Sequence, residues 1–257
     1  MLTDTHIHLD AHEFDADRDA LLAQARAGGV GRFVVPGVDV ASFDRVAALS
    51  RACADVRHAF GIHPLYVAAA ADGDLDVLEA RLARGGAVAV GEIGLDHFVT
   101  DVDPAVQERF FCAQLRLAQR FGLPVILHVR RAVDAILKWL RRIEVPGGIA
   151  HAFNGSRQQA DTLVAMGFKL GFGGAMTFDG SRRIRRLAVE LPLEAIVLET
   201  DAPDMAPAWA QGRRNEPANL PRYAQLLGEL RAVPVGEIVA ATGRNAEVAL
   251  PGLAAGA

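Results

Sequence analysis

Short apolar runs alternate with longer amphipathic stretches along the whole chain. The runs are rich in Val, Ile, Leu or Phe and too short for helices, which is typical of strands buried on both faces of a parallel sheet. These predicted strands lie at residues 1–5, 32–38, 58–62, 87–92, 125–128, 148–152, 169–172 and 196–199. Apolar residues recurring every three or four positions predict helices at residues 14–27, 40–54, 75–84, 105–121, 132–142, 157–166, 181–190, 220–231 and 235–249.

This alternation makes about eight strand–helix units followed by one extra helix, and it predicts an α/β fold of the TIM (β/α)8 barrel type. An open doubly wound sheet is the competing architecture, but its first strand is usually followed by a Gly-x-Gly-x-x-Gly turn, and here histidines stand in that place. No linker or charge run divides the 257 residues, of which 51% are hydrophobic. We therefore expect a single domain spanning residues 1–257.

Charge and cysteine content narrow the classes of function and location. A formal net charge of −4 creates no global field for a polyanion, which argues against a protein that coats DNA and leaves nucleic-acid binding to local groups and metal ions. Cys53 and Cys112 lie far apart in predicted helices, as expected of buried thiols in a reducing compartment. With no signal peptide or apolar segment of membrane-spanning length evident, we expect a cytoplasmic monomer without membrane association.

Residues of metal-ligand type stand at the ends of five predicted strands. Side chains at positions i and i+2 of a strand point the same way, so His6 and His8 should face one point. The full set comprises His6, His8, Glu92, His128, His151 and Asp201. Each member has an ordinary alternative: a hydrogen-bonded core histidine, an ion-paired glutamate or a capping aspartate. Their joint placement at the face where barrel enzymes carry their active sites favours a metal centre.

Six donors exceed the needs of one ion that keeps a position open for water, so the sequence predicts two divalent ions per chain. We expect His6, His8 and Asp201 around one ion, His128 and His151 around the other, and Glu92 between them. Histidines suit Zn²⁺ and Mn²⁺, while carboxylates also admit Mg²⁺. Two such ions lower the pKa of a bridging water and stabilise the oxygens of a displacement, and Asp201 is placed to accept the water's proton.

Six segments in order along the chain carry a family resemblance. They are TDTHIH at residues 3–8, GIHP at 61–64, GEIGLD at 91–96, LPVILH at 123–128, HAFNGS at 151–156 and ETDAP at 199–203. Together they closely resemble the TatD-type metal-dependent deoxyribonucleases of the amidohydrolase superfamily, and the likeness extends to NAE at 245–247. The resemblance implies a TIM barrel, a divalent metal centre at the residues just named, and hydrolysis of DNA phosphodiester bonds.

By the same resemblance, His63 would contact the substrate or transfer a proton near the scissile phosphate, which makes Asp201, His63 and Glu92 the candidate catalytic residues. The alternative for His63 is a hydrogen bond that fixes the tight turn at residues 61–64. The chain departs from the family pattern at His97, because in the family an aromatic residue commonly follows the Gly-Leu-Asp of this segment. His97 is expected to be a hydrogen-bonding residue of the cavity wall or an extra ligand.

Candidate phosphate-binding residues follow three of the predicted strands. Arg130 comes shortly after His128, Asn154 precedes a helix N-terminus, and Arg214 lies in the long loop after the last strand. An ordinary helix cap and a solvated loop are the alternatives. Four arginines on one predicted helix are expected to form a solvent-exposed face: Arg182, Arg183, Arg185 and Arg186.

The function expected from these residues is that of a metal-dependent hydrolase, a deoxyribonuclease of the exonuclease type with DNA as its substrate. Two alternatives stay open. Related amidohydrolases cleave small esters, amides or lactones with a similar water, so the ligands alone do not fix the bond. A barrel that binds metal without turnover is the other alternative, and the complete ligand set argues against it.

Overall fold

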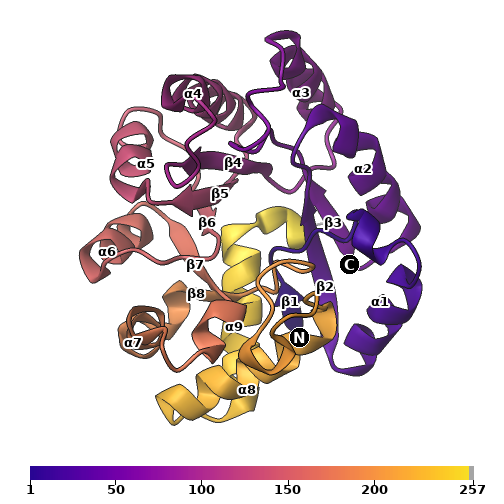
Figure 1. The fold of residues 1–257 in the computed structure, drawn as a ribbon, viewed down its shortest axis with the longest axis vertical. Helices are drawn as coiled ribbons and strands as arrows, with labels where there is room; N and C mark the ends of the chain where they lie inside the picture. Colours follow the sequence, from indigo (N-terminus) through magenta and orange to yellow (C-terminus); the bar gives the residue numbers. More distant parts are fainter. Residues whose placement is uncertain (255–257) are drawn as a thin grey trace.

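The computed structural model describes residues 1–254, in which eight strands alternate with helices (Figure 1). The strands are β1 (Leu2–Asp4), β2 (Val30–Pro36), β3 (Val56–Ala59), β4 (Val90–Asp96), β5 (Val125–Arg130), β6 (Gly148–Ala150), β7 (Phe168–Phe172) and β8 (Ile196–Leu198). The α-helices are α1 (Arg18–Ala27), α2 (Phe43–Ala52), α3 (Gly73–Ala83), α4 (Pro104–Phe121), α5 (Val133–Leu140), α6 (Arg157–Ala165), α7 (Arg182–Glu190), α8 (Leu220–Arg231) and α9 (Val235–Ala249).

All strand pairs are parallel and join neighbours in sequence, in the orders β1-β2-β3 and β4-β5-β6-β7-β8. Residues just beyond the strand ends connect the two groups. Phe60 pairs with Val90 between β3 and β4, and both the N–H and the hydroxyl of Thr5 donate to the carbonyl oxygen of Leu198 at 3.1 Å. The strands therefore close into a ring with the helices around it, and the predicted TIM barrel is confirmed.

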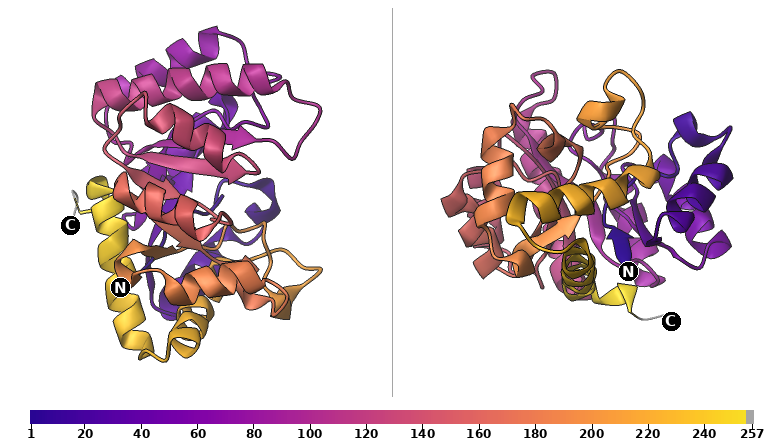
Figure 2. Two further views of the ribbon diagram at one scale, coloured as in Figure 1. Left: turned by 90° about the vertical axis from the view of Figure 1, so that its left-hand side faces the viewer. Right: turned by 90° about the horizontal axis from the view of Figure 1, so that it is seen from below.

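Helix α9 covers the end of the barrel at which the strands begin, and the first residues of the chain lie beside it (Figure 2). Its Ala246 and Ala249 belong to one buried apolar cluster with Val34 and Ile126 of the barrel strands. The side-chain amide of Asn245 donates to the carbonyl oxygens of Leu193 and Ile196, at 2.8 and 2.7 Å. With this end closed, a ligand reaches the barrel interior only from the carboxyl ends of the strands.

Three strand boundaries differ from the sequence prediction in ways that concern the site, and one of them is that β5 continues to Arg130 and so contains His128. Strand β1 ends at Asp4, so His6 and His8 follow the strand and do not lie on it. Strand β4 continues to Asp96, which places Glu92 inside the strand and not at its end. Cys112 is buried in α4 and Cys53 is half-buried directly after α2, both as free thiols. Within residues 1–254, no helix is long and apolar enough to cross a membrane.

Candidate metal centre

The extended segment after β1 brings His6 and His8 to one point. The N–H of Ile7 donates to the carbonyl oxygen of Val34 at 3.1 Å, while the carbonyl oxygen of His6 accepts from the N–H of Asp201 at 2.8 Å. Backbone bonds therefore alternate between two neighbouring strands, as they would within a strand, and the rings two residues apart converge. Their Nε2 atoms lie 3.3 Å apart.

Glu92 and Asp201 complete the first group of donors. One Glu92 carboxylate oxygen, Oε2, lies 3.1 Å from His6 Nε2 and 3.8 Å from His8 Nε2. Oδ1 of Asp201 lies 3.6 and 3.5 Å from the same two nitrogens. Asp201 follows β8 with a φ of 58°, a left-handed conformation that costs about 1–3 kcal/mol in a non-glycine residue and recurs at functional sites.

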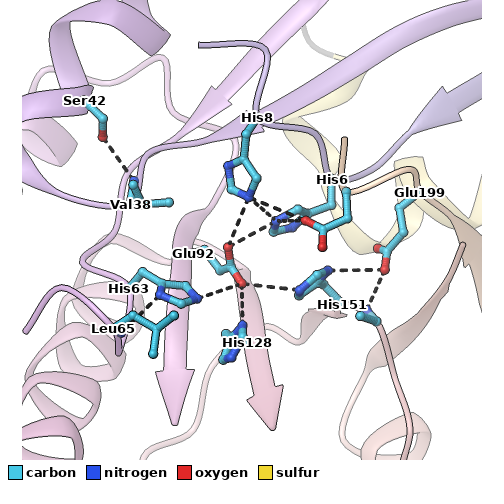
Figure 3. Close-up of polar contacts among 12 residues, drawn as sticks. His6, His8, Val38, Ser42, His63, Leu65, Glu92, His128, His151 and Glu199 are labelled. Carbon is cyan, nitrogen blue, oxygen red and sulfur yellow. Dashed lines mark hydrogen bonds and ion pairs between the residues drawn. The ribbon is translucent and has the colours of Figure 1, made fainter. Parts of the chain in front are cut away.

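The second Glu92 oxygen, Oε1, faces three further histidines on the other side of the carboxylate (Figure 3). It lies 2.9 Å from Nδ1 of His128 and 3.4 Å from Nε2 of both His151 and His63. Glu92 is 2% exposed and stands between two sets of nitrogen donors that come from different strands. One buried carboxylate thus connects every histidine predicted to bind metal.

Burial and the buried carboxylates act on these histidines in opposite directions. Burial alone would lower the pKa of His151, but Asp201, Glu92 and Glu199 outweigh it and raise this pKa to about 10. His8 behaves alike: Asp201 and Glu92 overcome burial and raise its pKa to about 9. Burial raises the pKa of Glu92, yet the surrounding histidines hold it well below its usual value. The cluster therefore binds positive charge strongly.

These residues fit a divalent metal centre. Donor atoms lie within 4.8 Å of one another in three groups: His6, Glu92 and His151; His6, His8 and Asp201; and His63, Glu92 and His128. In the described part of the chain, the buried Nδ1 of His6 has no hydrogen-bond partner, and the buried Nδ1 of His151 has only the approach of a Glu199 carboxylate oxygen at 3.3 Å. Buried carboxylates that face only histidines are a donor set suited to a cation.

His63 differs from the other histidines in its backbone contact. Its Nδ1 accepts the N–H of Leu65 at 3.2 Å, and burial lowers its pKa, so the ring is neutral near pH 7 and carries its proton at Nε2. That N–H points to Glu92 Oε1 and makes the ring a donor. The turn-fixing hydrogen bond and an inward-facing donor are both present, so the two interpretations of His63 are compatible.

Two acidic residues of the GEIGLD and ETDAP segments, Asp96 and Glu199, support the histidines, a role that the sequence does not predict. Asp96 ends β4 and its Oδ2 lies 3.1 Å from His128 Nε2; burial raises the pKa of Asp96, but hydrogen bonds from His128 and the following backbone hold it at about 2. Glu199 Oε1 accepts the N–H of Ala152 at 2.5 Å and lies 3.3 Å from His151 Nδ1. Motif membership was the available signal for both residues, but only the fold places them behind these histidines.

Two cavities meet at the cluster, and both are lined by His128, His151 and Asp201. We call the cavity of about 1080 Å³ the large chamber; it runs between the loop after β4 and the N-terminus of α7. The cavity of about 410 Å³ is the small chamber, lined by the loops after β1, β2 and β3. A substrate whose reacting bond lies at the cluster would extend into both chambers.

The structure distributes the predicted phosphate-binding residues unevenly. Arg130, Asn154 and His97 line the large chamber. Arg214 lines neither chamber, and its guanidinium is bound by Asp17 and Glu216. The loop after β8 folds back toward α1, where these acids neutralise the arginine, so the structure does not support Arg214 as a phosphate ligand.

The four arginines of α7 do not form one uniform solvent-exposed face: Arg182, Arg183 and Arg186 are exposed and Arg185 is half-buried, and Arg183 also belongs to the site. Arg183 lines the large chamber and donates from Nε and Nη2 to Oδ1 of Asn154, at 3.0 and 2.7 Å. It stands on the first turn of α7, at the carboxyl end of the barrel, so its side chain reaches over the rim. Helical periodicity predicts which face of a helix is exposed, but it does not predict that a residue at the end of the helix extends over the rim of the barrel.

Comparison with known proteins gives consistent results. The family model described as TatD related DNase matches residues 3–251. The E. coli K12 protein named uncharacterized metal-dependent hydrolase YjjV is 41% identical over 245 residues, 94% of this chain and 95% of the relative. The Cronobacter turicensis protein named 3'-5' ssDNA/RNA exonuclease TatD is 35% identical over 254 residues, 95% of each chain. The crystal structure of YjjV matches with a TM-score of 0.94 and 39% identity, covering 97% of this chain and 98% of that one.

Proposed function

The chain belongs to the family of TatD-related DNases and is a metal-dependent hydrolase, and from this we propose a finer function, that of an exonuclease-type deoxyribonuclease. The observation that carries the proposal is the position of Glu92, which connects two sets of histidines at the mouth of the barrel. Beside it lies a chamber with three arginine side chains, which suits a phosphodiester backbone. Relatives named as ssDNA/RNA exonucleases support the same substrate class.

In this proposal two divalent ions occupy the cluster, in the grouping that the sequence predicts. His6, His8 and Asp201 would hold one ion, His128 and His151 the other, with Glu92 shared. Zn²⁺, Mn²⁺ and Mg²⁺ all suit such mixed nitrogen and carboxylate ligands. The ions would supply Lewis-acid chemistry that activates water and stabilises charge on phosphoryl oxygens.

The side chains have separate roles around the scissile bond. Asp201 is 9% exposed and borders both chambers, so its carboxylate can accept the proton of the attacking water. His63 lines the small chamber beside the cluster, and its Nε2–H can hydrogen-bond an oxygen of the scissile phosphate. Glu92 is 2% exposed and faces histidines from both of its oxygens, so its role is to hold the two histidine sets together.

Parallel assays of metal-reconstituted protein test the substrate class. Single-stranded DNA is assayed beside double-stranded DNA, RNA and a panel of small esters, amides and lactones. We expect single-stranded DNA to be degraded, with activity lost in chelator and regained on adding Mn²⁺ or Zn²⁺. Turnover of the small substrates with every nucleic acid intact would favour the amidohydrolase alternative. Metal binding without any turnover would favour the non-catalytic one.

A matched pair of variants tests whether the cluster performs the reaction. His63→Ala should lower kcat by about 10²-fold, as for the loss of one hydrogen-bond donor to the charge that develops in the transition state. Asp179→Asn, whose side chain is 98% exposed, should leave activity unchanged. Equal activity of both variants would separate nuclease activity from this cluster.

A further inference from the structure

The two chambers that meet at the cluster carry opposite formal charge. Two aspartates, Asp201 and Asp204, line both chambers and are left out of the comparison. The large chamber is then lined by three arginines, Arg130, Arg131 and Arg183, against one aspartate, Asp134. Besides Glu92 of the cluster, the small chamber is lined by three acids, Asp10, Glu13 and Asp39, against one arginine, Arg45. A strand with one charge per phosphate is therefore attracted on one side of the cluster and repelled on the other.

The cations of the large chamber keep their charge available. Arg183 donates to the uncharged Asn154, and among residues 1–254 no carboxylate forms an ion pair with it. Arg130 lies 3.8 Å from the ring centre of Phe98, and its closest carboxylate oxygen, on Asp96, is 3.9 Å away. Phe98 is 46% exposed, which adds an aromatic surface beside the arginines. Cations next to an exposed aromatic ring are typical of a single-stranded nucleic-acid groove.

The small chamber combines its acids with exposed apolar side chains. Leu65 is 41% and Tyr66 is 45% exposed, and both line this chamber. Figure 3 shows Val38, Ser42 and Leu65, which line the small chamber, on the opposite side of Glu92 from His151 and Glu199. A volume of about 410 Å³ lies toward the lower end of the range for pockets that hold one small molecule, roughly 300–1,000 Å³. This surface suits an uncharged aromatic group with hydrogen-bond donors.

Resting on the proposed nuclease function, we propose that the small chamber holds the terminal nucleoside of the strand while the large chamber holds the phosphodiester backbone. The base packs on Tyr66 and Leu65, and the carboxylates of Glu13 and Asp39 face the terminal hydroxyl. A phosphate at that terminus meets these carboxylates and is repelled. The same repulsion keeps a longer strand from continuing into the small chamber, which restricts cleavage to the last nucleotide.

Oligonucleotides that differ only at their ends test this assignment. A single-stranded DNA with a hydroxyl or a phosphate at each end is digested by the reconstituted protein, and the products show which end is attacked. A phosphate at the attacked end should lower kcat/KM about tenfold at low salt, a difference of about 1.4 kcal/mol, and by less at high salt. Equal rates with either end group would overturn the inference and leave the nuclease function standing. Absence of digestion of every oligonucleotide would overturn both.

Charge-removing variants locate the effect. Glu13→Gln with Asp39→Asn removes two acids of the small chamber, and asparagine can still accept the N–H of Ser42 that Asp39 caps. This double variant should digest the phosphorylated strand nearly as well as the hydroxyl-ended one. The control, Asp19→Asn with Glu237→Gln, changes net charge equally at exposed helix positions and should keep the discrimination. Relief by both variants alike, or by neither, would refute the role of the small chamber.

A binding measurement separates recognition from turnover. Fluorescence anisotropy measures the binding of oligonucleotides to Asp201→Asn protein. The end-phosphorylated strand should bind more weakly than the hydroxyl-ended strand, and adding Tyr66→Ala to this protein should weaken binding of the hydroxyl-ended strand. Unchanged affinity in both comparisons would contradict the assignment of the terminal nucleoside to this chamber.

Discussion

Replacing Glu199 by Gln should weaken divalent-metal binding while the barrel stays folded. Glu199 is 1% exposed and holds the ring of His151 from behind, through the 3.3 Å approach of Oε1 to Nδ1. A carboxylate behind a metal-binding histidine fixes the ring and raises its basicity. Glutamine keeps the length and one oxygen for the N–H of Ala152, but it removes the charge.

The size of the effect follows from this contact. A metal-bound His151 is neutral, so Glu199 acts on metal affinity by fixing the ring at 3.3 Å and raising its basicity, and not through attraction between two full charges. Carboxylates in this position typically contribute 10–100-fold in metal affinity or activity. We therefore expect a loss of 10–100-fold in metal affinity, or about 1.4–2.7 kcal/mol.

Isothermal titration calorimetry of the metal-free protein with Zn²⁺ or Mn²⁺ measures this loss directly. The matched control is Glu194→Gln, which makes the same chemical change at an exposed position just before β8. Gly171→Ala provides a second route, because a Cβ at that position would overlap the Glu199 carboxylate and displace it. Metal affinity within twofold of wild type in both Glu199→Gln and Gly171→Ala would refute the reasoning.

Three further predictions concern the base, the protons and the phosphate contacts. Asp201→Asn should lower kcat about 10²-fold or more at saturating metal with little loss of bound metal, and near wild-type turnover would contradict its role as base. Because the pKa values of His8 and His151 are raised to about 9 and 10, metal binding at pH 7 should release up to about two protons, and metal affinity should increase as the pH rises toward 9. Calorimetry in buffers of different ionisation enthalpy measures the number of protons released, and a release of zero would contradict the prediction. Arg183→Ala should weaken binding of single-stranded DNA and flatten its salt dependence, whereas Arg214→Ala should change neither; the reverse order would contradict the placement of the backbone in the large chamber.

Hydrophobic periodicity was sufficient to predict the barrel because both its strands and its helices are regular. Helix α8 and helix α9 begin and end where the apolar spacing predicts. The strand ends were less well determined, since apolar content does not distinguish a paired residue from an extended one. His6 and His8 converge although β1 stops at Asp4, because the bonds of the following segment to its neighbours continue the strand geometry.

Residues of metal-ligand type on successive strands predicted a cluster, and the structure brings them together, whereas the surroundings of the arginines depend on long-range contacts. Arg214 and Arg183 illustrate the limit. Both stand near the carboxyl end of the barrel, yet Asp17, far away in sequence, neutralises the first, while Asn154 directs the second toward the large chamber. The residues next to each arginine in sequence do not predict these partners. The difference in charge between the two chambers depends on such partners.

Anomalous diffraction from crystals of the wild-type protein soaked in Mn²⁺ tests the metal centre most directly. We expect two peaks per chain, one among His6, His8 and Asp201 and one beside His128 and His151, with the Glu92 carboxylate between them. A single peak, or peaks away from Glu92, at a Mn²⁺ concentration that supports full activity would contradict this expectation.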